Sequence, residues 1–119
     1  MTLEEFRAEM DAYWQSVNEE ADALKDSYVA LERLRALYGK LDAAERDMAD
    51  QVISAWLLED HEGRQWDALV LVTDLAITAA IPALDTLSDR LATSTAPDAA
   101  QLAARVRKKI NELAAVREG

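Results

Sequence analysis

The run Glu59-Asp60-His61-Glu62 is the one place in the sequence where side chains suited to catalysis or metal binding stand together. It contains the only histidine of the chain, beside three carboxylates that could help to hold a divalent metal weakly. The His-Glu pair is half of the His-Glu-x-x-His zinc motif, but Gln65 occupies the position of the second histidine. We therefore predict a solvated turn without a metal, with a weak metal site as the alternative.

Other ingredients of catalytic centres are missing from the sequence. Gly39, Gly63 and Gly119 are isolated, so neither a phosphate-binding loop nor a dinucleotide-binding fingerprint can be built. The chain has no cysteine, and a Ser-His-Asp triad would have to recruit the histidine of the turn. Carboxylates are abundant, but no pair is marked out for burial in an apolar site, which a raised pKa would require. We expect no enzymatic activity and no cofactor.

Residues 1–41, which precede this turn, carry a heptad pattern. Thr2 and Glu5 have the spacing of a capping box, which predicts a helix start. Most positions of the two heptad rows are apolar: Leu3, Phe6, Met10, Tyr13, Val17, Leu24, Leu31, Leu34, Tyr38 and Leu41. The polar stretch from Asn18 to Ser27 interrupts one row, so we favour a helical hairpin that breaks near Lys25 to Ser27. The alternative is one unbroken helix of about 55 Å, which would pair with a second chain.

Two further helix starts follow. Tyr38-Gly39-Lys40 marks a boundary, and Asp42 with Glu45 predicts a helix that ends near Glu59. A C-terminal helix is predicted from Thr95 to Asp98 onward, with Pro97 in its first turn. The apolar stripes of these two helices contain Met48, Val52, Ala55, Trp56, Leu102, Val106, Ile110 and Leu113.

The stretch from Trp56 to Leu91 predicts two short helices that meet across an apolar seam. The first has apolar residues on two sides, so it should be covered on both. The second has Pro82 in its first turn, where the missing N–H costs little. A buried strand from Ala68 to Val72 is the alternative, because a short apolar run alone does not separate strand from helix. Trp14, Trp56 and Trp66 lie on apolar faces, and we predict that all three belong to the core.

The same stretch resembles a HEAT-type helical repeat unit at about residues 47–92. The resemblance rests on Leu57-Leu58, Asp60, Arg64, Asp67-Ala68-Leu69, Leu75, Ala80, Pro82-Ala83-Leu84 and Leu87. It implies a helical hairpin, a structural role for Asp60 and Arg64, and a protein used as a binding scaffold. Where such units often have a glycine after the first helix, this chain has Ala76 and Ile77.

These patterns predict an all-α fold. We expect a compact bundle of about five to six helices, in which a HEAT-like hairpin from Asp42 to Leu91 is covered by the N- and C-terminal helices. One domain over residues 1–119 would consist of heptad-patterned helices over 1–41, the HEAT-like unit over 42–92 and a C-terminal helix over 95–118.

The net charge of −10 is distributed unevenly. Residues 1–62 contain 16 Asp and Glu against 6 Lys and Arg, whereas residues 63–119 contain 7 of each kind. An acidic half would repel nucleic acid and attract a basic protein. The alternative is an acidic surface that only maintains solubility. The cations Arg105, Arg107, Lys108 and Lys109 are interpreted as complementing the dipole of the last helix, and not as a nucleic-acid site. We predict partner binding through Glu19, Glu20, Asp22, Asp26, Glu45, Asp47, Asp50, Glu59, Asp60 and Glu62.

The leading hypothesis is a non-enzymatic protein-binding module. An acidic inhibitor, such as a bacterial immunity protein that neutralises a basic toxin or nuclease, suits this profile. A structural homodimer that pairs through the seam from Leu3 to Leu41 is the alternative. The lack of cysteine, the acidic start MTLEEFRAEM and the absence of an apolar run near the ~20 residues that span a bilayer favour a cytoplasmic protein without membrane contact.

Overall fold

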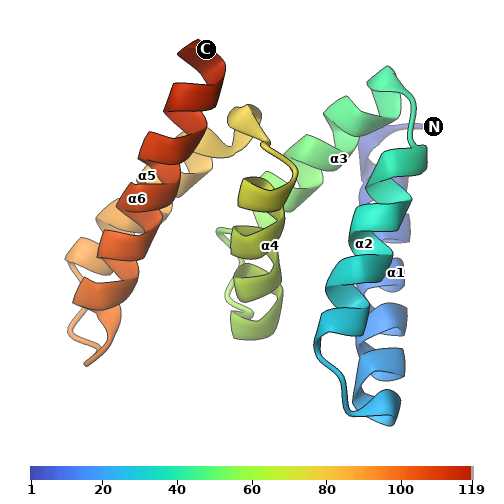
Figure 1. Cartoon of the computed structure of the whole chain (residues 1–119), viewed down its shortest axis with the longest axis horizontal. Helices are drawn as coiled ribbons and strands as arrows, with labels where there is room; N and C mark the ends of the chain where they lie inside the picture. Colours follow the sequence, from blue (N-terminus) through green and yellow to red (C-terminus); the bar gives the residue numbers. More distant parts are fainter. Residues whose placement is uncertain (119) are drawn as a thin grey trace. The chain divides into compact units, whose positions relative to one another are not determined.

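The computed structural model describes the backbone of residues 1–118 and all of their side chains except those of Glu62, Arg117 and Glu118. All the regular secondary structure in this part of the chain is helical, without a strand, which confirms the predicted all-α class (Figure 1). The alternative of a strand at Ala68 to Val72 is wrong, because these residues lie inside a helix. The elements are α1 (Leu3–Leu24), α2 (Tyr28–Lys40), α3 (Ala43–Trp56), α4 (Glu62–Asp74), the 3-10 turn η1 (Thr78–Ala80), α5 (Ile81–Ala92) and α6 (Ala99–Glu118).

The helices group into two compact units. The first is Met1–Val52 and the second is Ile53–Gly119, so the boundary lies within α3. A single domain over the whole chain stays a prediction. Among the residues that the structure describes, none of the helices combines the length and the apolar character that crossing a bilayer needs.

The first unit is built on a hairpin of α1 and α2, which lie side by side in Figure 1. α1 starts at the predicted capping box, where the Glu5 backbone N–H donates to Thr2 Oγ1 at 3.2 Å. The helix ends at Lys25, whose φ of 55° turns the chain, and α2 begins at Tyr28. The predicted break near Lys25 to Ser27 is confirmed, and the unbroken helix is wrong. The buried side chains of the two helices are Phe6, Met10, Trp14, Val17, Ala21, Ala30, Leu31 and Leu34.

The junction between α2 and α3 is held by local hydrogen bonds. α2 runs to the end of the Tyr38-Gly39-Lys40 segment, so the predicted boundary lies in its last turn. α3 follows the predicted capping box: the Glu45 N–H donates to Asp42 Oδ1 at 2.8 Å, and the Asp42 N–H donates to Glu45 Oε1 at 3.1 Å. Arg46 Nη2 donates to the Gly39 carbonyl at 3.2 Å and so satisfies a carbonyl that the end of α2 leaves open.

The second unit contains the end of α3 and helices α4 to α6. α5 and α6 pack along one another, and α4 also contacts α6 (Figure 1). Pro82 lies in the first turn of α5, as predicted. The prediction that Pro97 lies in the first turn of α6 is wrong: the first helical bond runs from the Leu102 N–H to the Asp98 carbonyl, and the helix begins at Ala99. Buried side chains in this unit include Trp56, Leu57, Ala68, Leu69, Leu71, Val72, Ile77, Ile81, Leu84, Leu87, Val106 and Leu113.

α4 ends in a left-handed turn at an alanine. Ala76 has a φ of 51°. The Ile77 N–H donates to the Val72 carbonyl at 2.9 Å, and the Ala76 N–H donates to the Thr73 carbonyl at 3.2 Å. This is a Schellman ending, in which the left-handed residue is usually glycine because a Cβ is strained there. The missing glycine of the HEAT-type pattern therefore falls on a position whose backbone favours glycine.

Ala76→Gly should raise the free energy of unfolding by about 0.5–1 kcal/mol. Relief of the left-handed strain gains about 1–2 kcal/mol, and the greater freedom of glycine in the unfolded chain offsets about 0.4–1 kcal/mol of it. The Ala76 side chain is exposed, so its removal leaves no cavity. Urea unfolding followed by far-UV circular dichroism measures the change. A lower midpoint for the variant would contradict the left-handed turn.

Candidate functional site

His61 is placed to cap α4. It is the N-cap residue of that helix, and its Nδ1 accepts a hydrogen bond from the Arg64 backbone N–H at 3.2 Å. The Arg64 side chain turns back, where Nη1 donates to Glu59 Oε2 at 2.8 Å and the guanidinium lies 5.7 Å from the centre of the Trp56 ring. Arg64 thus stabilises its own turn, and the role that the HEAT resemblance implies for it stays a prediction. Asp60 is exposed and has no such contact among the side chains described.

The turn does not bring a metal site together within the part of the chain that the structure describes. No three of its His, Asp and Glu side chains are placed to share a metal ion. The side chain of Glu62, the last member of the run, lies outside the described residues. The imidazole and the Glu59 carboxylate already take part in the structure of the turn, and we do not propose a metal here.

Many of the predicted partner-binding acids stabilise the chain itself. They accept hydrogen bonds at helix ends or pair with a cation or a hydroxyl: Glu20 with Arg33 (2.9 Å), Asp26 with the Tyr28 N–H (3.0 Å), Glu45 with the Asp42 N–H (3.1 Å), Asp50 with the Tyr38 hydroxyl (2.8 Å) and Glu59 with Arg64 (2.8 Å). For Glu20 and Asp50 the sequence could not show these structural roles, because their partners lie on other helices.

Four of the other acids, all with described side chains, remain available to a partner. Asp22, Asp47 and Asp60 are exposed, and among the described residues their carboxylates make no hydrogen bond or ion pair. Glu19 is exposed and has only a 3.5 Å contact with Gln15. Within the first unit these acids do not form one face: Glu19 and Asp22 lie at the end of α1, and Asp47 follows α2, a helix of about 20 Å.

The end of the α1–α2 hairpin combines free carboxylates with exposed apolar groups. We call Glu19, Asp22, Leu24, Asp26 and Tyr28 the hairpin tip. Tyr28 is 68% exposed and Leu24 is 60% exposed, more than any other large apolar side chain described except Met1. The carboxylate of Asp26 is exposed although it accepts the Tyr28 N–H. The segment carries these carboxylates against one cation, Lys25, so an exposed ring and an aliphatic chain at an acidic helix end make a surface suited to a basic protein.

Tyr38 and Asp50 form a polar contact between α2 and α3. The Tyr38 hydroxyl donates to Asp50 Oδ1 at 2.8 Å. Burial and the neighbouring carboxylate raise the pKa of Tyr38 to about 12, so the hydroxyl remains a donor at neutral pH. Burial raises the pKa of Asp50 above its ordinary value, while the bond from Tyr38 acts in the opposite direction. This partly buried carboxylate therefore acts in the structure of the first unit.

Tyr38→Phe should lower the free energy of unfolding by about 1–2 kcal/mol at pH 7, because it removes a hydrogen bond to the partly buried carboxylate of Asp50. The pKa of Asp50 is raised in the folded chain, so protonation favours folding: the stability from this group is present below the unfolded pKa and is lost as the pH rises through the folded one. The bond from Tyr38 favours the charged form of Asp50, so the cost of Tyr38→Phe should shrink in acid, where this carboxylate is protonated. Urea unfolding at pH 7 and pH 4 tests this, with Asp50→Asn as the control that removes the pH dependence.

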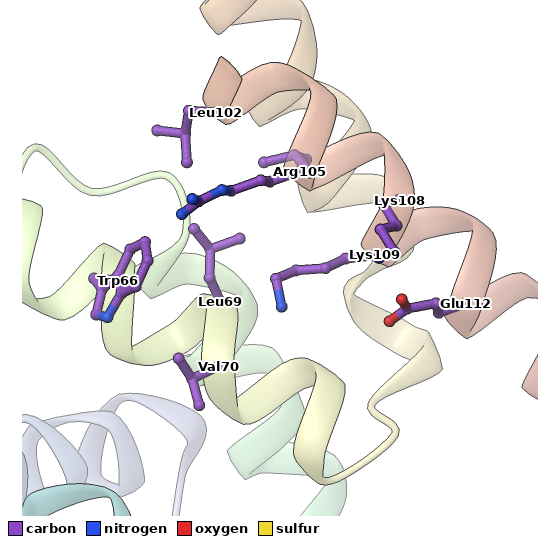
Figure 2. A pocket seen from close by; sticks show the side chains of 9 residues that line it. Trp66, Leu69, Val70, Leu102, Arg105, Lys108, Lys109 and Glu112 are labelled. Carbon is purple, nitrogen blue, oxygen red and sulfur yellow. The ribbon is translucent and has the colours of Figure 1, made fainter. Parts of the chain in front are cut away.

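Trp66 is not in the core, contrary to the prediction. It is 50% exposed, whereas Trp14 and Trp56 are 8% and 0% exposed. Trp66 stands at a pocket between α4 and α6 in the second unit, with a volume of about 240 Å³ (Figure 2). Leu69, one turn further along α4, is 3% exposed, so Trp66 lies at the edge of the buried face of this helix. The sequence marked the cations of α6, and nothing in it placed Trp66 beside them.

The comparisons with known proteins give no relative of this chain. No family model, no curated protein and no solved structure matches it. The HEAT resemblance stays a sequence-based prediction.

Proposed function

We propose that this chain is a non-enzymatic protein-binding module whose hairpin tip binds a basic surface of another protein. An acidic inhibitor or immunity-type protein that neutralises a basic toxin or nuclease would act in this way. The observation that carries the proposal is the position of Tyr28 and Leu24: both are exposed to solvent at the turn of the hairpin, in a segment that also carries Asp22 and Asp26.

The chemistry of the tip suits such a partner. Tyrosine is among the residues that contribute most at protein interfaces, because it buries a large rigid ring and still presents a hydroxyl. The net charge of −10 accelerates the encounter with a basic protein. Glu19 and Asp22 lie three residues apart on α1, so both can meet cations of one partner surface. A surface that only maintained solubility would not require the exposed apolar groups.

Site-specific photocrosslinking tests the proposal. A benzophenone amino acid in place of Tyr28 should capture a basic protein from a lysate of the native host. The same amino acid in place of Ala8, which is exposed on α1 and roughly 24 Å along the helix from the tip, is the matched control and should not capture it. Capture at both positions, or of an acidic protein at the tip, would contradict the proposal.

Binding measurements with the captured partner provide a second test. Tyr28→Ala should weaken binding about 30-fold, the loss expected for an interface residue worth about 2 kcal/mol. Asp22→Lys should slow association about tenfold at low salt, and the effect should diminish as salt rises. Asp47→Lys makes the same charge change beyond the far end of α2 and serves as the control. If Asp22→Lys and Asp47→Lys slow association equally, the effect comes from the net charge of the chain, and the hairpin tip is not the binding surface.

A further inference from the structure

The groove between α4 and α6 has an apolar wall and an aromatic end. We call Trp66, Leu69, Val70, Leu102 and Val106, with the cations beside them, the α4–α6 groove. Figure 2 shows the Trp66 ring at one side, Leu69 and Val70 along α4, and Leu102 on α6 facing them. The lining is mostly apolar, and the exposed half of the indole adds a flat ring that a ligand could cover. A groove of this kind accepts large apolar side chains.

The cations of α6 stand along this groove. Arg105, Lys108 and Lys109 all line it, together with the single carboxylate of Glu112 (Figure 2). Arg105 and Lys108 are exposed, and no other described residue pairs with them. Lys109 Nζ donates to Thr73 Oγ1 at 3.0 Å, a bond to a neutral hydroxyl that leaves its charge uncompensated. The mouth of the groove is therefore positive on a chain whose net charge is −10.

The cation that lies outside this lining has a different environment. Arg107 donates to Asp85 at 3.2 Å and to Asp89 at 3.4 Å, both on α5. The two environments separate the roles of the α6 cations. Arg107 links α5 to α6, whereas Arg105 and Lys108 have no charge partner within the described chain. The sequence-based interpretation was that all four α6 cations complement the helix dipole. It does not explain why Arg107 pairs with acids of α5 while Arg105 and Lys108 do not.

We propose that the α4–α6 groove binds an acidic amphipathic segment of a partner protein. The segment would place one large apolar side chain against Trp66, Leu69 and Val106, and its carboxylates would meet Arg105 and Lys108. The apolar wall favours the apolar side chain, and the cations favour the carboxylates, so one segment should carry both. The volume of about 240 Å³ lies below the ~300–1,000 Å³ of most small-molecule sites, so it matches one or two side chains better than a whole ligand.

This surface is opposite in sign to the hairpin tip and independent of it. A basic partner at the tip and an acidic segment at the groove would make the chain an adaptor with two binding surfaces. Single-stranded nucleic acid fits less well, because successive bases need several stacking rings and the groove has one. A second copy could offer Tyr28 and Leu24 of its own tip, but it would bring a net charge of −10 to the groove, far more than a short acidic segment, so long-range repulsion disfavours it more strongly.

Selection from a library of random peptides displayed on phage tests the proposal with the full chain. Enriched peptides should contain a large apolar residue with Asp or Glu one helical turn away. Measured by fluorescence anisotropy, they should bind Lys108→Glu and Trp66→Ala at least about tenfold more weakly than the natural chain. Two matched controls should bind as the natural chain does: Lys40→Glu makes the same charge change at an exposed position of the first unit, and Tyr28→Ala removes another exposed ring.

Other results would overturn the proposal. Enriched peptides that are basic or neutral, or that bind Lys108→Glu and Trp66→Ala as well as the natural chain, would exclude the acidic segment. Labelled oligothymidine that binds in a Trp66-dependent manner while acidic peptides do not would assign the groove to nucleic acid. Self-association in sedimentation that Trp66→Ala abolishes would assign it to a second copy. Lys108 is exposed, so its variant remains informative even if Trp66→Ala weakens the fold.

Discussion

Replacing Trp56 by alanine should lower the free energy of unfolding by about 4 kcal/mol, the middle of the range for a deleted core tryptophan. Trp56 is the largest side chain with 0% exposure, and the Arg64 guanidinium lies over its ring at 5.7 Å. The variant would leave a cavity and would also remove the aromatic face from a partly buried cation. Urea unfolding followed by far-UV circular dichroism measures the loss.

Trp66→Ala is the matched control for this change. The same atoms are removed from a side chain that is 50% exposed, so the loss should be about half as large, about 2 kcal/mol. The ratio of the two effects tests the assignment of one tryptophan to the core and the other to a surface. Equal losses of unfolding free energy would indicate that Trp66 is buried in the core, and would contradict its place at the α4–α6 groove.

Leu34→Ala should cost about 3 kcal/mol, because Leu34 is 3% exposed in the helix that packs against α1. Leu24 belongs to the same heptad pattern but is 60% exposed, so Leu24→Ala should cost less than about 1 kcal/mol. Urea unfolding of both variants provides the comparison. Equal costs would contradict the arrangement of the hairpin.

The same titrations address the homodimer alternative. The heptad residues of α1 and α2 fill the hairpin of one chain, and pairing between chains would compete with that packing. The unfolding midpoint should therefore not depend on protein concentration. A midpoint that rises with concentration is the signature of a folded oligomer and would favour the homodimer.

Local signals in the sequence predicted the helix ends well. The capping boxes at Thr2 and Asp42 form the hydrogen bonds that their spacing implies, because each bond joins residues only three positions apart. The break after α1 followed from the interrupted heptad row. The first turn of α6 was misplaced, since Pro97 is tolerated just before a helix as well as inside its first turn.

The candidate sites were less predictable, because they depend on contacts between helices. The pairing of Glu20 with Arg33 joins α1 to α2, and only the fold shows that this acid is already neutralised. Trp66 was assigned to the core on apolar periodicity, which marks a face without giving its edge. Exposure of Tyr28 and Leu24 likewise followed from the place where the hairpin turns, and a list of acidic residues did not indicate it.

Because the tryptophans differ in exposure, the fluorescence of Trp66 can report whether the α4–α6 groove is occupied. Trp66 is the indole most open to water, so collisional quenchers such as acrylamide should reach it far more readily than Trp14 or Trp56. A molecule that covers the ring should shift the emission maximum toward the blue and shield it from the quencher. Occupancy of the α4–α6 groove can thus be followed from the intrinsic fluorescence of the natural chain, without attaching a dye.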